Sequence, residues 1–289
     1  MSEKFKSILS YSLALFNFLA GAASIISLVN SITTGILAVS FIVVFCLAFC
    51  ICVAIIIYRA LKPLSDKVDE ISTGYIDISE KFASETIRLR ECFHSGIDAK
   101  KFQREMLEGC HYLIAEIQKT LANTFGKKVR VCIKAYRNNT QDLLFTYCRD
   151  GLTADQSIKR EHGQSIEIYK NSDFSNIVSG NQDIFIGNDL KKDFKQGKYH
   201  NTNKDFKYSS AVVVPIRALV NETENSARYD NIGFLCVDSK HKNMFQSQQS
   251  KMCIDLICST AHLLYVFMTA GKEYYDSIVV ASTKGDING

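Results

Sequence analysis

The chain has 289 residues and a formal net charge of +4, and charged residues make up 22% of it. These charges are unevenly placed, because no Asp, Glu, Lys or Arg occurs between Ser7 and Tyr58. An uncharged, apolar stretch of this length belongs in lipid, which excludes a protein that is soluble along its whole length. The net charge is too small and too mixed in sign to indicate nucleic acid, and we expect no nucleic-acid partner.

The uncharged stretch has the length of two membrane-spanning helices, since about 20 residues cross the hydrocarbon layer. We place the spans at about Leu9 to Val29 and about Gly35 to Tyr58, with a short polar turn between them. A cleaved signal peptide is the competing interpretation, but no small-residue cleavage site follows the first span. Residues 1–58 are therefore predicted to form a two-span hairpin.

Positive residues flank the hairpin and are absent from its turn: Lys4 and Lys6 precede it, and Arg59, Lys62 and Lys67 follow it. The positive-inside rule then places both termini in the cytoplasm. We expect a multi-pass protein of a bacterial-type inner (cytoplasmic) membrane.

Residues 59–97 are predicted as linker helices. Leu61, Leu64, Val68 and Ile71 form one apolar seam, and Gly74 is placed to end that helix. With a Pro shortly after the membrane helix, the stretch resembles the first helix of a HAMP signal-relay module. The acidic start of a second HAMP helix is hard to find, so a plain amphipathic linker helix remains the alternative.

The soluble part begins with a helix that Asp98 caps and Gly126 ends, with one apolar face. We expect next a hairpin of two strands at 128–135 and 142–148, a short strand at 164–169, a small helix at 173–180 and a brief strand at 184–186. A polar loop at 189–207 leads to two stronger strands at 208–217 and 232–238, and a closing helix of about twenty residues follows Phe245. Pro215 should lie at an edge or a bulge. This order predicts an α+β layer architecture.

The run SSAVVVPI at 209–216, the run IGFLCVD at 232–238, the later Phe245 and the final amphipathic helix together resemble a GAF domain. The resemblance covers residues 98–271 and leaves 272–289 as a tail. It implies an antiparallel sheet of about six strands flanked by helices, with a small-ligand pocket on one face. The PAS fold is the nearest competitor.

The ligand and any cofactor stay open at this point. GAF domains that bind cyclic nucleotides carry an Asn-Lys pair and an acidic pair around a Phe; Phe245 is present here, but those pairs are not. The sequence runs typical of bilin-binding members are also missing. Six lysines lie between 191 and 207, which favours either a solvated loop, an anionic or nucleotide-like ligand, or anionic headgroups.

For the pocket we predict a small set of ligand-binding residues that mixes apolar walls with polar groups. Core packing and turn capping are the alternatives for the same positions. The set is Phe174, Ile177, Asp189, Tyr208 and Ser210.

Cysteine and histidine give no further site. The ten cysteines lack metal-like spacing, and we expect reduced thiols that mostly pack the core. Some small GAF proteins reduce free methionine sulfoxide with pocket cysteines, but Cys132, Cys148 and Cys236 lie on predicted strands, where an inert thiol is the usual state. The six histidines form no ligand pair, so no metal is expected. We predict no catalytic residues and a chain that is not an enzyme.

The first functional hypothesis is a membrane-anchored small-ligand sensor. It would form a homodimer or higher homo-oligomer through its linker helices and signal to a protein partner. The second is an effector whose hairpins permeabilise the membrane when a nucleotide-like signal binds. The third, with the least support, is a thiol enzyme on a GAF scaffold.

Overall fold

The structure is a computed structural model that describes residues 20–27, 36–137, 142–151, 154, 156, 165–223 and 226–285. The chain divides into two compact units, Met1–Asp66 and Lys67–Gly289. Most of the first predicted span lies outside the described residues. Helix α2 (Ile36–His94) covers the second predicted span and continues far beyond it.

Two helices in the described part are long and apolar enough to cross a membrane. The α2 segment Ile42–His94 contains a window of mean hydropathy 2.8, and none of that window is buried in the protein. The other is α7 (Gln248–Gly285), whose window has a mean hydropathy of 1.5 and is 44% buried. Since α7 packs in the core of the second unit, α2 is the stronger membrane candidate.

The prediction that a helix ends at Gly74 is wrong, because α2 runs unbroken to His94. Gly74 instead lies where α2 touches helix α3 (Ala99–Phe125). A Cβ atom at this position would stand 2.1 Å from Cγ2 of Thr120. The glycine is therefore a packing position, and residues predicted as linker, such as Ile71, Ile78 and Leu89, belong to the hydrophobic core.

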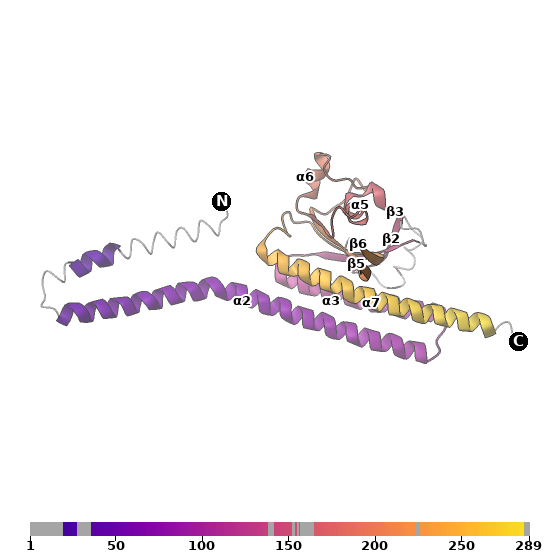
Figure 1. Cartoon of the computed structure of the whole chain (residues 1–289), viewed down its shortest axis with the longest axis horizontal. Coiled ribbons are helices and arrows are strands. Elements are labelled where there is room, and N and C mark those ends of the chain that lie inside the picture. Colours follow the sequence, from indigo (N-terminus) through magenta and orange to yellow (C-terminus); the bar gives the residue numbers. More distant parts are fainter. Residues whose placement is uncertain are drawn as a thin grey trace. The chain divides into compact units, whose positions relative to one another are not determined.

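Helix α3 begins and ends as the sequence predicts. The Asp98 side chain accepts a hydrogen bond from the Lys101 amide, and Gly126 has the left-handed conformation (φ 60°) that ends a helix. Its apolar face packs on the sheet beside α7, as Figure 1 shows.

The second unit contains one six-stranded antiparallel sheet, in the order β3-β2-β1-β6-β5-β4. The strands are β1 (Arg130–Tyr136), β2 (Leu143–Arg149), β3 (Ile166–Glu167), β4 (Phe185–Gly187), β5 (Ser210–Thr223) and β6 (Ser226–Ser239). Helices α3 and α7 cover one face, and the short helices η1 (Ile168–Lys170), α5 (Ser172–Val178) and α6 (Leu190–Lys195) lie on the other side (Figure 1). The predicted α+β architecture of about six antiparallel strands with flanking helices is confirmed.

Side chains of the central strands alternate between two apolar clusters. Val131, Ile133, Leu235 and Val237 face α3 and α7, and their neighbours Cys132, Phe234 and Cys236 face the other way. This is the two-residue periodicity of a strand that is buried on both sides.

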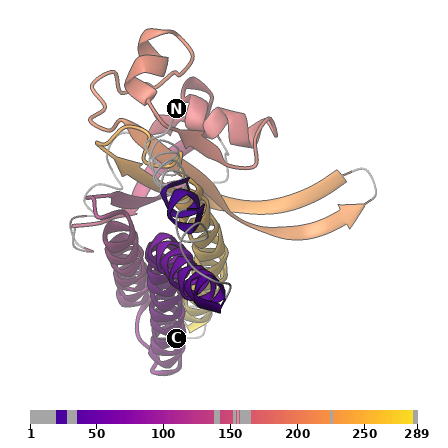
Figure 2. The same cartoon turned by 90° about the vertical axis from the view of Figure 1, so that its left-hand side faces the viewer.

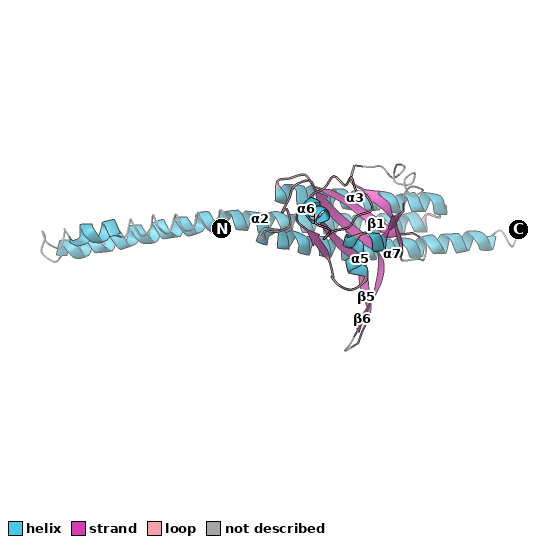
Figure 3. Ribbon diagram, turned by 90° about the horizontal axis from the view of Figure 1, so that it is seen from above, coloured by secondary structure: helices cyan, strands magenta, loops and turns pink. Residues whose placement is uncertain are grey.

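The pair β5 and β6 is longer than predicted. The polar stretch expected as a loop around Asn221 belongs to the strands, which pair in register from Ser210–Ser239 to Thr223–Ser226. The end of this hairpin extends beyond the other strands, as Figures 2 and 3 show. Pro215 lies past the last residue of β5 that pairs with β4, so its missing N–H costs the sheet no ladder bond there.

Two further segments differ from prediction. The polar loop 189–207 contains α6, which Asp189 caps by accepting a hydrogen bond from the Lys192 amide. The segment 272–289 was expected to be a tail, but α7 continues through it to Gly285. Tyr274 of this continuation stacks on Phe93 of α2 with ring centroids 4.7 Å apart, so it is part of the folded unit.

Candidate functional site

A cavity of about 780 Å³ lies on the face of the sheet opposite α3 and α7. Its walls come from strands β1, β2, β5 and β6, from α5, and from the segment 201–206 that precedes β5. A volume of this size falls within the range of small-molecule sites in proteins.

A cluster of hydroxyl, amide and carboxyl groups borders the cavity through Asp173, Asn201 and Tyr208, and the buried Tyr199 joins it from outside the lining. The Tyr199 hydroxyl donates to Asp173 Oδ2 at 3.2 Å and lies 3.2 Å from the Tyr208 hydroxyl. Asn201 Nδ2 donates to both tyrosine oxygens at 2.8 Å. Burial is the main reason why the pKa values of both tyrosines are raised. Both hydroxyls thus keep their protons, and the proton of Tyr199 is used in the bond to Asp173.

Asp173 is the most unusual member of this cluster. Its side chain is 5% exposed, and its Oδ1 atom has no hydrogen-bond partner among the described residues. Burial raises the pKa of Asp173 to about 6, against the opposing effect of the bond from Tyr199. A buried carboxylate with an unused acceptor is costly for a fold, which makes Asp173 a candidate binding group.

Two cationic side chains, Lys134 and Arg149, border the same cavity beside the carboxylate of Asp238, and a β-bulge places Arg149 there. Between β1 and β2 the register changes from Ile133↔Cys148 to Lys134↔Thr146, which leaves Tyr147 as the extra residue. The bulge lets Arg149 and Thr146 border the cavity while Cys148 packs into the helical core. Lys134 Nζ donates to Thr146 Oγ1 at 2.6 Å, and this bond holds the buried ammonium at the cavity lining.

Two cysteines also border the cavity. Cys132 and Cys236 are directly opposite each other in the antiparallel pair of β1 and β6, and both border the cavity. Their thiols interact closely enough to shift each other's ionisation. The interaction with Cys236, followed by the charges of Lys134 and Arg149, lowers the pKa of Cys132 despite its burial, and the same interaction together with burial raises the pKa of Cys236.

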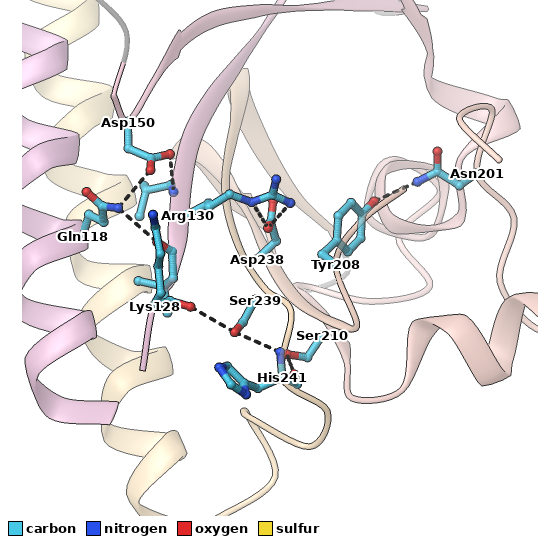
Figure 4. A network of polar contacts seen from close by, with 12 residues as sticks. Gln118, Lys128, Arg130, Asp150, Asn201, Tyr208, Ser210, Asp238, Ser239 and His241 are labelled. Atoms are coloured by element: carbon cyan, nitrogen blue, oxygen red, sulfur yellow. Dashed lines mark hydrogen bonds and ion pairs between the residues drawn. The ribbon is translucent and has the colours of Figure 1, made fainter. Parts of the chain in front are cut away.

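A network of hydrogen bonds fixes the ends of these strands (Figure 4). Arg130 Nε donates to Asp238 Oδ1 at 2.6 Å across β1 and β6. Asp150 Oδ1 accepts from the Val131 amide, and Gln118 of α3 donates to Asp150 Oδ2 at 2.9 Å. These bonds hold β1 in place, and with it the cavity wall.

The five residues predicted for the pocket are distributed unevenly. Phe174 and Tyr208 border the cavity. Ile177 packs in the apolar cluster behind it. Asp189 caps α6 and pairs with Lys242 at 2.9 Å, and the Ser210 hydroxyl donates to the His241 carbonyl. Ligand binding by Phe174 and Tyr208 stays a prediction. Ile177, Asp189 and Ser210 make structural contacts and do not line the cavity.

The sequence interpretation missed most polar groups of the cavity, namely Lys134, Arg149, Asp173, Asn201 and Asp238. A lysine in the otherwise apolar strand 131–135 and an aspartate at the start of a short apolar helix were available signals. The place of Arg149 was not, because it depends on a bulge whose extra residue, Tyr147, has nothing distinctive in sequence.

No protein-family model and no curated protein matches the chain. Solved structures of similar fold include the GAF domain of an Acinetobacter phosphoenolpyruvate-protein phosphotransferase, at 12% identity and a TM-score of 0.38, covering 66% of this chain and 94% of that one. A putative GAF sensor protein from Burkholderia vietnamiensis matches at 14% identity and a TM-score of 0.36, covering 64% and 92%. A free methionine-R-sulfoxide reductase from Neisseria meningitidis matches at 15% identity and a TM-score of 0.35, covering 59% and 90%.

One prediction requires correction here. The chain was expected not to be an enzyme, but the structures similar to it include reductases as well as sensor domains. The expectation therefore does not hold. The architecture itself, an antiparallel sheet with helices on both sides and a cavity on one face, is the one that the GAF resemblance implies.

Proposed function

We propose that the second unit is a GAF-type sensor that binds a small polar molecule in the 780 Å³ cavity. The observation that supports this most is the cavity itself, enclosed by strands of the central sheet and lined by opposed charges. Asp173 offers a carboxylate acceptor and Tyr208 a hydroxyl, and Lys134 and Arg149 offer cationic donors. A ligand that matches these groups would carry an N–H or hydroxyl donor for Asp173 and an anionic group for the two cations.

We also propose that α2 anchors this sensor in the inner membrane, with both termini in the cytoplasm. The support is the uncharged stretch Ser7–Tyr58 and the apolar, unburied window of α2. Beyond Lys67 the same helix packs on α3 through Gly74, and its Arg88 Nε bonds Glu85 at 2.7 Å while the guanidinium also reaches Glu105 of α3. A change in the packing of α3 would thus be felt directly by α2, which gives a signal a route to a protein partner.

Native mass spectrometry of the full chain, released gently from detergent, tests the ligand. We expect an added small-molecule mass on the wild-type protein. Occupancy should fall at least about tenfold in Asp173→Asn, since one charged hydrogen bond is worth roughly 1.5–3 kcal/mol. Asp189→Asn is the matched control, a carboxylate-to-amide change outside the cavity. An empty wild-type cavity that also takes up nothing from a cell extract would refute the proposal.

A dye-release experiment distinguishes the sensor hypothesis from the hypothesis of a membrane-permeabilising effector. Liposomes that contain the full chain and an entrapped dye should retain the dye when the identified ligand is added. Ligand-dependent dye release would favour the effector instead.

A further inference from the structure

We propose that Cys132 and Cys236 form a redox-active dithiol, which a small hydroperoxide converts into a cross-strand disulfide. The site goes beyond ligand sensing and does not depend on which ligand binds.

Geometry favours this bond. Residues directly opposite each other in an antiparallel pair have Cα atoms about 4.5–5.5 Å apart, within the range of about 4.4–6.8 Å found in disulfides. Cys132 and Cys236 are such partners, and both side chains border the same cavity. Joining the two sulfurs requires side-chain movement but no change of strand register.

Access and electrostatics favour Cys132 as the attacking group. Both cysteines border the cavity, so a small oxidant reaches them from the cavity rather than through the core. The pKa of Cys132 is lowered mainly by its interaction with Cys236 and further by the charges of Lys134 and Arg149, so these neighbours favour a thiolate there. Cys236, with its raised pKa, retains its proton and is suited to the second step.

The chemistry balances in two steps. The Cys132 thiolate attacks one oxygen of the hydroperoxide, the O–O bond breaks, and the leaving alkoxide takes a proton to become an alcohol. Cys132 is then a sulfenic acid, oxidised by two electrons that the peroxide has gained. The Cys236 sulfur attacks this sulfenic acid, the S–O bond breaks, and the hydroxide leaves with the Cys236 proton as water. Two thiols and one hydroperoxide thus give one disulfide, one alcohol and one water.

The chain contains a matched control pair. Cys110 of α3 and Cys148 of β2 also lie close enough to affect ionisation, but both are fully buried in the helical core and neither borders the cavity. Burial is the main cause of the raised pKa of Cys148. If closeness of two thiols were sufficient, this pair would oxidise equally well.

The test uses the reduced full chain in detergent, treated with one equivalent of hydrogen peroxide, blocked with N-ethylmaleimide and digested with trypsin without reduction. We expect a peptide pair that joins residues 131–134 (VCIK) to 229–240 (YDNIGFLCVDSK) and disappears on treatment with dithiothreitol. Cys132 should be consumed at least about tenfold faster than Cys148. In Cys236→Ser, dimedone should trap a sulfenic acid at Cys132, and Cys148→Ser should leave the linked pair unchanged.

Wild-type protein alone decides the result, so a poorly folding variant leaves the test intact. The proposal is overturned if Cys132 and Cys236 stay reduced while Cys148 or the cysteines of α2 are consumed. Linkage of Cys132 to another cysteine would overturn it as well. Ligand occupancy is measured separately with Asp173→Asn, so failure of the dithiol and failure of the sensor are distinguishable.

Discussion

Replacing Gly74 by alanine tests the contact between α2 and α3. In an ordinary helix interior this change stabilises by up to about 1 kcal/mol, because alanine is the better helix former. Here the new Cβ would lie 2.1 Å from Thr120 Cγ2 and 2.9 Å from its Oγ1, whereas carbon atoms pack at about 3.5–4.0 Å. Thr120 is buried and β-branched, so it has little freedom to move aside.

Overpacking of this kind costs about 1–3 kcal/mol, and the overlap of more than an ångström puts Gly74→Ala at the upper end. After the gain in helix propensity, we expect a net loss of about 2 kcal/mol in the free energy of unfolding. Thr120→Ala removes the two nearest of the three atoms that the new methyl would meet and leaves only the Thr120 Cβ, at 3.1 Å. The double variant Gly74→Ala, Thr120→Ala should therefore be more stable than the sum of the single changes predicts, by about 1–2 kcal/mol.

The assay is urea unfolding of the full chain in detergent, followed by circular dichroism. Ser72→Ala, at an exposed position two residues earlier in α2, is the control and should change stability by less than about 0.5 kcal/mol. A Gly74→Ala protein as stable as the wild type, or additive effects in the double variant, would mean that α2 does not pack on α3 at this point.

Three further predictions concern the sheet and the cavity. Burial raises the pKa of Asp173 to about 6 in the folded protein, so the wild type should lose stability as pH rises from about 4 to 6 and remain at the lower level above that. In urea titrations, Asp173→Asn should be more stable than the wild type at pH 7.5, by about 1–3 kcal/mol, and should lose this advantage near pH 4. Gly233→Ala should cost more than about 2 kcal/mol in thermal unfolding, since its Cβ would lie 2.2 Å from the Lys134 carbonyl oxygen. Gly126→Ala, where the left-handed φ of 60° is the only obstacle, is the control and should cost about 1 kcal/mol. Equal losses of stability in the two variants would refute the close approach of β1 and β6. Tyr199→Phe should destabilise by about 1–3 kcal/mol, since Asp173 loses its donor, and a value near zero would show that water replaces the hydroxyl.

Local sequence signals predicted most of the helices and strands because those signals are themselves local. Asp98 and Gly126 bound α3 as their capping preferences require. Gly74 failed as a stop signal for a different reason. Glycine serves both at helix ends and at close helix contacts, and only the position of Thr120, 46 residues later (120 − 74), decides between the two.

The far end of the β5–β6 hairpin was missed for a similar reason. Asn221 and Glu222 carry no strand periodicity, but the backbone pairing that begins in the buried part of β5 and β6 continues through them. Such a polar strand is stabilised by its partner and not by burial, so a pattern search for buried faces does not find it.

The candidate site was predictable only in outline. Phe174 and Tyr208 were found because they are large residues on elements that border a GAF-like pocket. The dithiol was not, since nothing in either strand shows that Cys132 lies opposite Cys236. Strand register comes from long-range pairing, and a shift of one residue would turn either thiol into the helical core.

The same alternation ties the cavity to the helices. In β1 and β6 the residues that border the cavity, Cys132 and Cys236, alternate with Val131, Ile133, Leu235 and Val237, which pack under α3 and α7. A ligand or a disulfide that shifts these strands must therefore move side chains on the helical face, because a packed core transmits displacement instead of absorbing it. Helix α3 contacts both the strands that hold the proposed site and, at Gly74, helix α2, which carries the apolar segment. A displacement of the strands can therefore reach α2 through α3.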